Sequence, residues 1–519
     1  MVNVDIRIGS LANCLAVLAV LAGAFAWAFF VARTRNESLL LAPFILVVAA
    51  CAGFWAARGY GGLDESEHLH CAYLVSKGML PYRDFWQHHP PLIWLCMAPL
   101  MRWFDSSPWI YEISRLIWTG VFVLIGLLGW VVARRVWRGQ ASAGVYWLVF
   151  LASAVLWLFP VVRPDLPSVL LMLGGIYFCL HAARGRNWAC LCCGAAISLA
   201  LTFTYKHFIL ALVPPIVILA RPPGRRLYRV ALYVAGLVGG VLPLAFYLAH
   251  NGLLRDFLEW VLLFNRKLSY VSASFPLAVV AAGLLGWYFL LKRRQSLDGH
   301  AALVLLLCWP LCTFSSILNS GNTMYFYLNL WFVLAAVLSG GLGVGGWLER
   351  FAARRAAVSG VAAIVLAALT LPSLYYAHQA AYGPSRYSHR DLARLIKLCR
   401  DDTCFVLLPH HPIFSRDATR LYAAWQYVYA SEFSEVRRYL GGGDLAAAIL
   451  DRRPALITRD ISTLIGLGRG DEIFRDMTEK RIISEADREA ITEMLSRDYA
   501  IEEIGNWRFY VRKDRAARR

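Results

Sequence analysis

The sequence predicts an all-α polytopic membrane protein that ends in a small α/β domain. Of its 519 residues, 59% are hydrophobic and only 17% are charged, and the mean hydropathy is +0.52. Soluble globular chains are roughly half apolar and about one quarter charged. Apolar runs of roughly 18 residues or more recur along most of the chain, and a helix of that length spans a bilayer. Because lipid cannot satisfy backbone polar groups, we expect these runs to be helices.

About twelve membrane spans are predicted within residues 1–380, which form the predicted transmembrane domain. We expect the first apolar run to be a membrane span and not a signal peptide, because it is too long and no small-residue cleavage site follows it. The predicted spans cover residues 10–32, 39–57, 111–133, 141–160, 166–183, 188–204, 207–220, 228–249, 275–291, 301–318, 325–346 and 357–376.

Clusters of Lys and Arg predict how the spans are oriented. They occur in alternate connections, which are therefore predicted to be cytoplasmic. This distribution also explains the net charge of +18 without a nucleic-acid partner. The connections 58–110 and 250–274 and both termini are then expected on the outer, periplasmic side. The clusters are Arg33/Arg35, Arg134/Arg135/Arg138, Arg184/Arg186, Arg221/Arg225/Arg226/Arg229, Lys292/Arg293/Arg294 and Arg350/Arg354/Arg355.

Residues 381–519 have the composition of a soluble domain. The segment DLARLIKLC predicts a helix, TCFVLLP a strand, and GGGDLAAAILDRRPALITRD a glycine-led helix followed by a strand. EADREAITEMLSRDY predicts another helix, and IEEIGNWRFYVRK ends as a strand. Strands that alternate with helices predict a small α/β domain. Cys399 and Cys404 would pair only in an oxidising compartment, and the sequence leaves this open.

The connection 58–110, the first outer loop, has the densest polar residues beside a predicted span. Such density favours a functional surface over a plain connector. Short helices at the membrane surface are expected within 68–78 and 91–104, which are too short to span it. Asp64 is either a solvated loop carboxylate or a general base that removes a proton from an incoming hydroxyl, with Glu65 beside it.

Histidines are frequent in this loop. The spacing of Glu67, His68 and His70 matches no known metal site, so packing is the expected role and no metal is predicted. His88 and His89 precede two prolines. They are either a neutral structural pair or donors to a phosphate.

Two cationic groups lie at the predicted outer ends of spans, in Arg163-Pro164-Asp165 and Lys206-His207. Lys and Arg often extend to the membrane interface with no further role. These cations, however, lie opposite the cytoplasmic clusters, where topology does not require them. An anionic ligand is therefore the preferred interpretation. Tyr325 is a weaker candidate, because aromatic residues there commonly form interface belts.

The motifs that the sequence lacks exclude some classes of substrate. The chain has no G-x-x-x-x-G-K-[ST] and no D-x-D, so nothing indicates a nucleotide or a nucleotide sugar. A sugar donor on the outer side would be carried by a lipid, and a lipid phosphate is a good leaving group. One carboxylate base and a cationic clamp would then suffice, without a cofactor.

The first outer loop resembles that of GT-C glycosyltransferases. The pattern is an apolar span, Asp-Glu, a G-x-x-PY-x-D run from Gly78 to Asp84, and Pro90-Pro91-Leu92. It is most similar to the protein mannosyltransferase-like, ArnT-like group, and the resemblance covers about residues 39–345. Members of this group often have Lys before the two prolines, where His89 stands here. The histidine at this position argues against aminoarabinose as the transferred sugar, but it does not argue against a GT-C glycosyltransferase.

The resemblance implies the GT-C fold and an inverting glycosyltransferase in a bacterial inner membrane. It would move a sugar from a polyprenyl-phosphate donor to a lipid, polysaccharide or protein acceptor at the periplasmic face. Asp64 would be the base, and Arg163 and Lys206 would contact the donor phosphate. A transporter or flippase for a lipid-linked sugar, and a non-catalytic partner in polysaccharide assembly, are the alternatives. Further substrate-binding candidates are Tyr82, Arg83, Asp84, Asp165, His207 and Tyr325.

Overall fold

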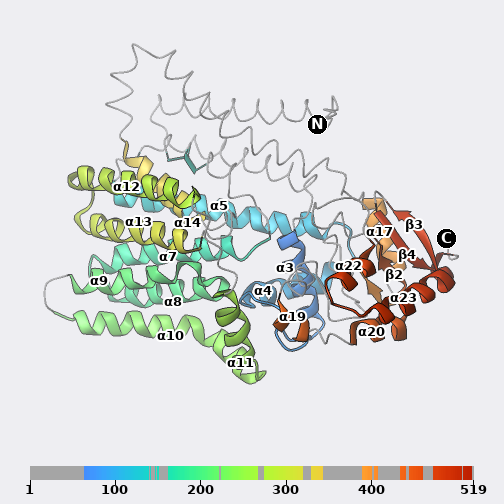
Figure 1. Ribbon diagram of the computed structural model, residues 1–519. Coiled ribbons are helices and arrows are strands. Elements are labelled where there is room, and N and C mark those ends of the chain that lie inside the picture. Colours follow the sequence, from blue (N-terminus) through green and yellow to red (C-terminus); the bar gives the residue numbers. More distant parts are fainter. Residues whose placement is uncertain are drawn as a thin grey trace, which may run out of the picture.

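The chain folds into a bundle of helices with a small α/β domain beside it (Figure 1). A computed structural model describes residues 63–138, 141, 146–147, 149–150, 162–220, 224–266, 274–319, 329–342, 389–399, 402–406, 433–439, 444–459, 472–504 and 507–516.

The bundle consists of α-helices joined by short 3-10 and π-helical segments. Its α-helices are α3 (Leu63–Ser76), α4 (Leu92–Phe104), α5 (Ile110–Val136), α7 (Asp165–Ala182), α8 (Asn187–Phe203), α9 (Val213–Leu219), α10 (Arg226–His250), α11 (Leu254–Phe257), α12 (Ser274–Arg293), α13 (Gly299–Asn319) and α14 (Asn329–Ser339). The short segments are η1 (Tyr205–Leu212), η2 (Leu258–Leu263), η3 (Phe264–Arg266), η4 (Arg294–Ser296) and η6 (Gly340–Leu342).

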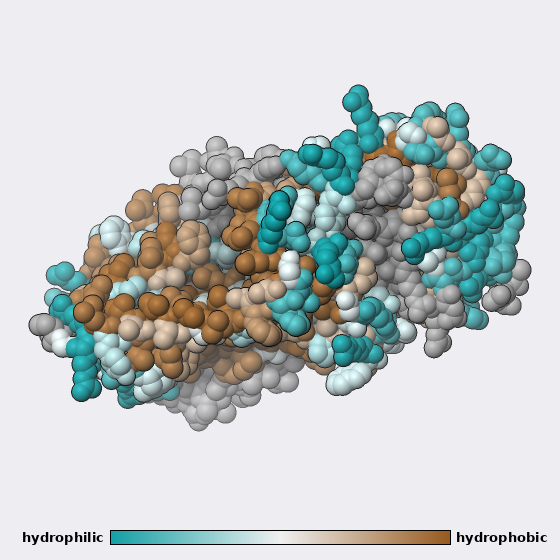
Figure 2. Space-filling view, turned by 90° about the horizontal axis from the view of Figure 1, so that it is seen from below, coloured by the Kyte–Doolittle hydropathy of each residue, from teal (hydrophilic) through white to brown (hydrophobic). Residues whose placement is uncertain are grey.

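Within the described residues, three helices are long and apolar enough to cross a membrane: α5, α7 and α10. Large apolar side chains face outward from this part of the molecule, such as Leu116 (70% exposed) and Phe246 (72% exposed). Figure 2 shows apolar residues over the helical part of one face and hydrophilic residues over the C-terminal domain. An exposed apolar surface of this kind is typical of a protein embedded in a membrane.

Most predicted spans in the described part agree with observed helices to within a few residues. The predicted span 207–220 corresponds to one apolar helical run, Tyr205–Leu219, which begins as the 3-10 segment η1 and continues as α9. Pro214 and Pro215 lie in the first turn of α9, where proline is tolerated. The predicted spans 10–32, 39–57 and 357–376, and most of 141–160, lie outside the described residues.

The connections 58–110 and 250–274, which were predicted to be outer, contain more helix than expected. Asp64 and Glu65 lie in the first turn of α3 instead of a loop, and α4 confirms the short helix expected within 91–104. The connection 250–274 is helical through α11, η2 and η3. These helices bring side chains from the first connection against those of the second.

Helices α8 and α10 pack closely because small residues face each other. A Cβ on Gly194 would meet the backbone oxygen of Tyr233, and one on Gly236 would meet the backbone oxygen of Leu191. Small residues let helix backbones approach in this way, as they do between helices in membranes.

The C-terminal domain confirms the predicted alternation of helices and strands. Its four-stranded sheet has the order β1-β2-β4-β3; β1 and β2 are parallel, and β4 is antiparallel to β2 and β3. The final segment forms two adjacent antiparallel strands, β3 and β4, in which Ile504 pairs with Trp507. The elements are α17 (His389–Cys399), β1 (Cys404–Phe405), α19 (Ser434–Tyr439), α20 (Asp444–Arg452), β2 (Leu456–Thr458), α22 (Ile473–Glu479), α23 (Glu485–Asp498), β3 (Tyr499–Ile504), β4 (Trp507–Arg512) and α24 (Lys513–Ala516).

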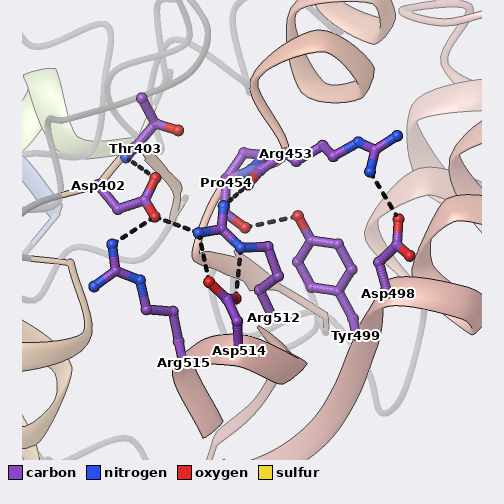
Figure 3. Close-up of polar contacts among 9 residues, drawn as sticks. All are labelled: Asp402, Thr403, Arg453, Pro454, Asp498, Tyr499, Arg512, Asp514 and Arg515. Carbon is purple, nitrogen blue, oxygen red and sulfur yellow. Dashed lines mark hydrogen bonds and ion pairs between the residues drawn. The ribbon is translucent and has the colours of Figure 1, made fainter. Parts of the chain in front are cut away.

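A polar cluster joins the end of this domain to its first strand (Figure 3). Asp402 accepts hydrogen bonds from Arg512 and Arg515, and Arg512 also pairs with Asp514. The Tyr499 hydroxyl donates to the Pro454 carbonyl at 2.7 Å. Cys399 and Cys404 are buried free thiols, so the disulfide that the sequence left open is not formed here.

Candidate functional site

Two of the predicted cations meet at one buried carboxylate. Arg163 Nε lies 3.0 Å from one oxygen of Asp165, and Lys206 Nζ lies 2.7 Å from the other. Asp165 opens α7, while Lys206 follows the end of α8, so the packing of these two helices creates the contact. All three side chains are at most 12% exposed. Both cationic head groups are thus held at one point, and we call this group the Asp165 cluster.

Three histidines of the first connection lie next to the Asp165 cluster. The rings of His68 and His89 are 5.1 Å apart, and those of His88 and His89 are 4.1 Å apart. Lys206 acts electrostatically on all three rings, and Asp165 acts on His68 and His89. Burial and the Lys206 charge hold the pKa of His88 and of His89 well below the usual value. Both imidazoles are therefore neutral at pH 7, and a neutral imidazole can still donate one N–H.

The loop that carries His88 and His89 is held by Tyr82. Its backbone is in the left-handed region, with φ of 68°, which is unusual for a bulky residue. Its amide donates to the Phe85 carbonyl at 2.9 Å, and its hydroxyl donates to the His89 carbonyl at 2.6 Å. Asp84 accepts a hydrogen bond from the Leu80 amide at 2.7 Å. Tyr82 and Asp84 thus shape the loop, and Arg83 is an exposed residue paired with Asp84 at 3.4 Å.

The second outer connection also holds this loop. Asn265 in η3 donates to the His88 carbonyl at 2.7 Å. The Trp86 ring stacks on His88 with centroids 5.3 Å apart, and it meets the Phe264 ring edge-on, also at 5.3 Å. The second connection therefore holds the backbone of His88 directly and its ring through Trp86.

Glu65 has a clear structural partner. Its two oxygens accept from Arg115 Nε at 2.9 Å and from Arg115 Nη2 at 2.6 Å, and one of them accepts from the Val162 amide at 3.2 Å. Both side chains are at most 1% exposed. This paired contact joins α3 to α5 and to the chain just before Arg163. We therefore assign Glu65 a positioning role, whereas the sequence placed it beside the base.

Asp64 lies one residue earlier in α3, and its side chain is outside the described part of the structure, as is Tyr325. In a helix, residues four apart lie on one face. Position 64 therefore shares a face of α3 with His68, which lies beside the Asp165 cluster. His207 is buried, and its Nδ1 lies 3.4 Å from the Ser315 hydroxyl on α13.

Glu67 is the other buried acid of α3. Burial raises its pKa to about 7, although the Gln87 amide donates to it at 2.5 Å and opposes that shift. Over the residues described, no group of three or more His, Cys, Asp and Glu side chains is placed to hold a metal ion.

The cationic connections and the site lie at opposite ends of the helices. Arg229 donates to the Gly185 carbonyl at 3.1 Å, Arg184 pairs with Asp298 at 2.7 Å, and the Asp298 amide donates to Val136 at 3.1 Å. These contacts bring the ends of α5 and α7, the start of α10 and the connection before α13 together. The Asp165 cluster is at the start of α7, the other end of that helix. The predicted partition is confirmed for these connections, while the orientation in a membrane stays a prediction.

Several residues of the site were not predicted as functional from the sequence. Arg115 lies inside an apolar span, where an ionisable residue is a signal of a specific partner. Asn265 had no such signal, because it contacts His88 only through its place in the fold. His68 was assigned to packing on its spacing alone.

The chain is similar to several solved structures. The crystal structure of the Archaeoglobus fulgidus oligosaccharyltransferase in the apo form is similar with a TM-score of 0.47 and 11% identity, over 83% of this chain and 71% of that chain. No protein-family model and no curated protein sequence matches the chain.

Proposed function

We propose that this protein is an inverting glycosyltransferase of the GT-C type. It takes a sugar from a polyprenyl-phosphate donor and transfers it to an envelope acceptor, a lipid, polysaccharide or protein, at the periplasmic face of a bacterial inner membrane. The observation that carries the proposal is the convergence of Arg163 and Lys206 on one buried point beside neutral histidines. A phosphate needs such a set of charged and neutral N–H donors.

In the proposed reaction Asp64 is the base. It removes the proton from the acceptor hydroxyl, whose oxygen attacks the anomeric carbon of the sugar. The bond from that carbon to the phosphate oxygen breaks on the opposite face, so the configuration inverts. The phosphate leaves with the electron pair. Lys206, Arg163 and the loop that carries His88 and His89 stabilise its charge. Glu65 and Arg115 hold α3, which carries Asp64, against α5.

Burial also supports this role for the Asp165 cluster. A surface cation would be hydrated and would gain little from a phosphate, whereas a nearly buried one is already desolvated by the fold. Asp165 keeps both cations in place while no donor is bound. A donor phosphate would then bind to groups that are already positioned.

The proposal is tested by measuring how the purified full-length protein binds undecaprenyl phosphate in detergent. Lys206→Ala is expected to raise the Kd about tenfold or more, because a hydrogen bond to a charged group contributes about 1.5–3 kcal/mol. Lys206→Arg keeps the charge and is expected to keep most of the affinity.

Lys77→Ala is the matched control. Lys77 also pairs with an aspartate at 2.7 Å, but its side chain is 45% exposed, so its loss should leave the Kd unchanged. Equal binding by the wild type and Lys206→Ala, with both folded, contradicts the assignment of the donor site.

A further inference from the structure

His68 is a buried histidine of α3 that the reaction above does not use. It is 1% exposed, and its Nε2 has no hydrogen-bond partner within the described part of the chain. Buried polar atoms nearly always have partners, so an open one next to a ligand site points to a partner that arrives with the ligand. The charged groups that act on the His68 ring are Asp165 and Lys206.

The tautomer of His68 follows from its other ring nitrogen. Trp94 Nε1 lies 3.2 Å from His68 Nδ1. An indole nitrogen can only donate, so Nδ1 must be the acceptor and carries no proton. Burial lowers the pKa of His68 to about 3, so the ring is neutral at pH 7. A neutral imidazole has one N–H, and here it must be on Nε2.

We propose that His68 is a further donor-binding residue, whose Nε2–H donates to a phosphate oxygen of the lipid-linked sugar donor. Trp94 is the positioning residue that fixes this tautomer. The inference rests on the proposed function and adds a neutral donor from α3 to the cations of the Asp165 cluster. An anionic oxygen is the preferred acceptor because the positive charge of Lys206 acts on the His68 ring.

A neutral donor at this place has a physical advantage. Another cation so close to Lys206 and Arg163 would be repelled and would need its own buried counter-charge. A neutral N–H adds a hydrogen bond without that cost. The phosphate then meets donors from α3, from the segment before α7 and from η1.

The test is the affinity of the full-length protein for undecaprenyl phosphate. His68→Phe keeps a ring of similar shape and removes the donor, and it is expected to raise the Kd about tenfold or more. His68→Gln places an amide N–H near the position of Nε2 and is expected to stay within about threefold of the wild type.

Trp94 supplies a second measurement through a double-mutant cycle. Trp94→Phe is expected to weaken binding in the wild type, because Nδ1 can then compete for the proton. The same substitution should have little effect beside His68→Gln, which has no tautomers. Equal Kd values for the wild type and His68→Phe, both folded by thermal unfolding, overturn the inference while the proposed function stands. Absence of undecaprenyl phosphate binding by the wild type overturns both.

Discussion

At the scale of single residues, two acids of α3 separated by one position have different environments. Glu65 pairs with Arg115, and Glu67 accepts a hydrogen bond from Gln87. The first is a buried ion pair with each partner's charge balanced. The second is a buried acid whose proton is held more tightly than usual. These environments lead to separate predictions.

Glu65→Ala is expected to destabilise the protein by about 3–5 kcal/mol, because it leaves Arg115 as a buried charge without its carboxylate. Asp105→Ala is the matched control: it breaks the Lys77–Asp105 pair, which has the same kind of contact at 2.7 Å but a largely exposed lysine. Its expected cost is about 1 kcal/mol or less. Denaturant unfolding of the purified variants measures the free energy of unfolding that each substitution removes. Equal losses would contradict the assignment of Glu65 and Arg115 as a buried ion pair that stabilises the fold.

The raised pKa of Glu67 predicts that the stability of the protein depends on pH. Because its pKa is about 7 in the folded protein and near the usual value of roughly 4.3 when unfolded, the folded state binds more protons between these values. The contribution of Glu67 to the free energy of unfolding therefore falls by roughly 3–4 kcal/mol as pH rises through this window and is constant above it. Glu67→Gln should gain in unfolding temperature relative to the wild type as pH rises from about 4.5 to 7. Parallel curves for the two proteins would contradict the raised pKa.

The sequence identified Arg163 and Lys206 but could not show how they are held. Their cationic character and their place at the ends of spans were visible, because topology did not require them there. Their common partner Asp165 depends on the packing of α7 against α8 and η1, which no local pattern specifies. The same reason hides the Glu65–Arg115 pair, whose members are 50 residues apart.

At the scale of elements, the contact of α8 with α10 depends on glycine. Gly236→Ala is expected to destabilise the protein, because the new Cβ would meet the backbone of Leu191, which cannot move independently of α8. Gly239→Ala is the matched control in the same helix, since a Cβ there meets nothing within 4 Å. It should be neutral or slightly stabilising. Thermal unfolding in detergent measures the difference, and equal unfolding temperatures would refute the close packing.

Hydropathy predicted the positions of the helices well, but it did not predict where one type of helix changes into another. The ends of α7 and α8 were predicted to within one residue, since apolar length determines them. The change from the 3-10 geometry of η1 to the α-helix α9 within the predicted span 207–220 was not predicted, because both segments belong to one apolar run. The short helix α4 was predicted within the connection 58–110, whereas the start of α3 at Leu63 and the helix α11 were not. Helix α11 packs against a distant segment through Phe257, whose ring lies 5.9 Å from that of Tyr82.

At the scale of the whole molecule, the C-terminal domain reaches the site through aromatic rings. Phe433 meets Phe264 at 5.2 Å, and Tyr439 meets Trp260 at 5.5 Å. Trp260 and Phe264 both contact Trp86, whose ring stacks on His88. In Figure 1, α19 accordingly lies beside the first helices of the bundle. Under the proposed function, we expect this domain to help select the acceptor.

The most direct test of glycosyl transfer is a turnover assay with purified protein, radiolabelled polyprenyl-phosphate sugars and an envelope extract as acceptor. The wild type is expected to transfer label and release polyprenyl phosphate, and Asp64→Asn is expected to bind the donor normally while losing nearly all transfer. Donor binding without transfer by the wild type would indicate a transporter or a non-catalytic partner. Near-normal transfer by Asp64→Asn would contradict the proposed base.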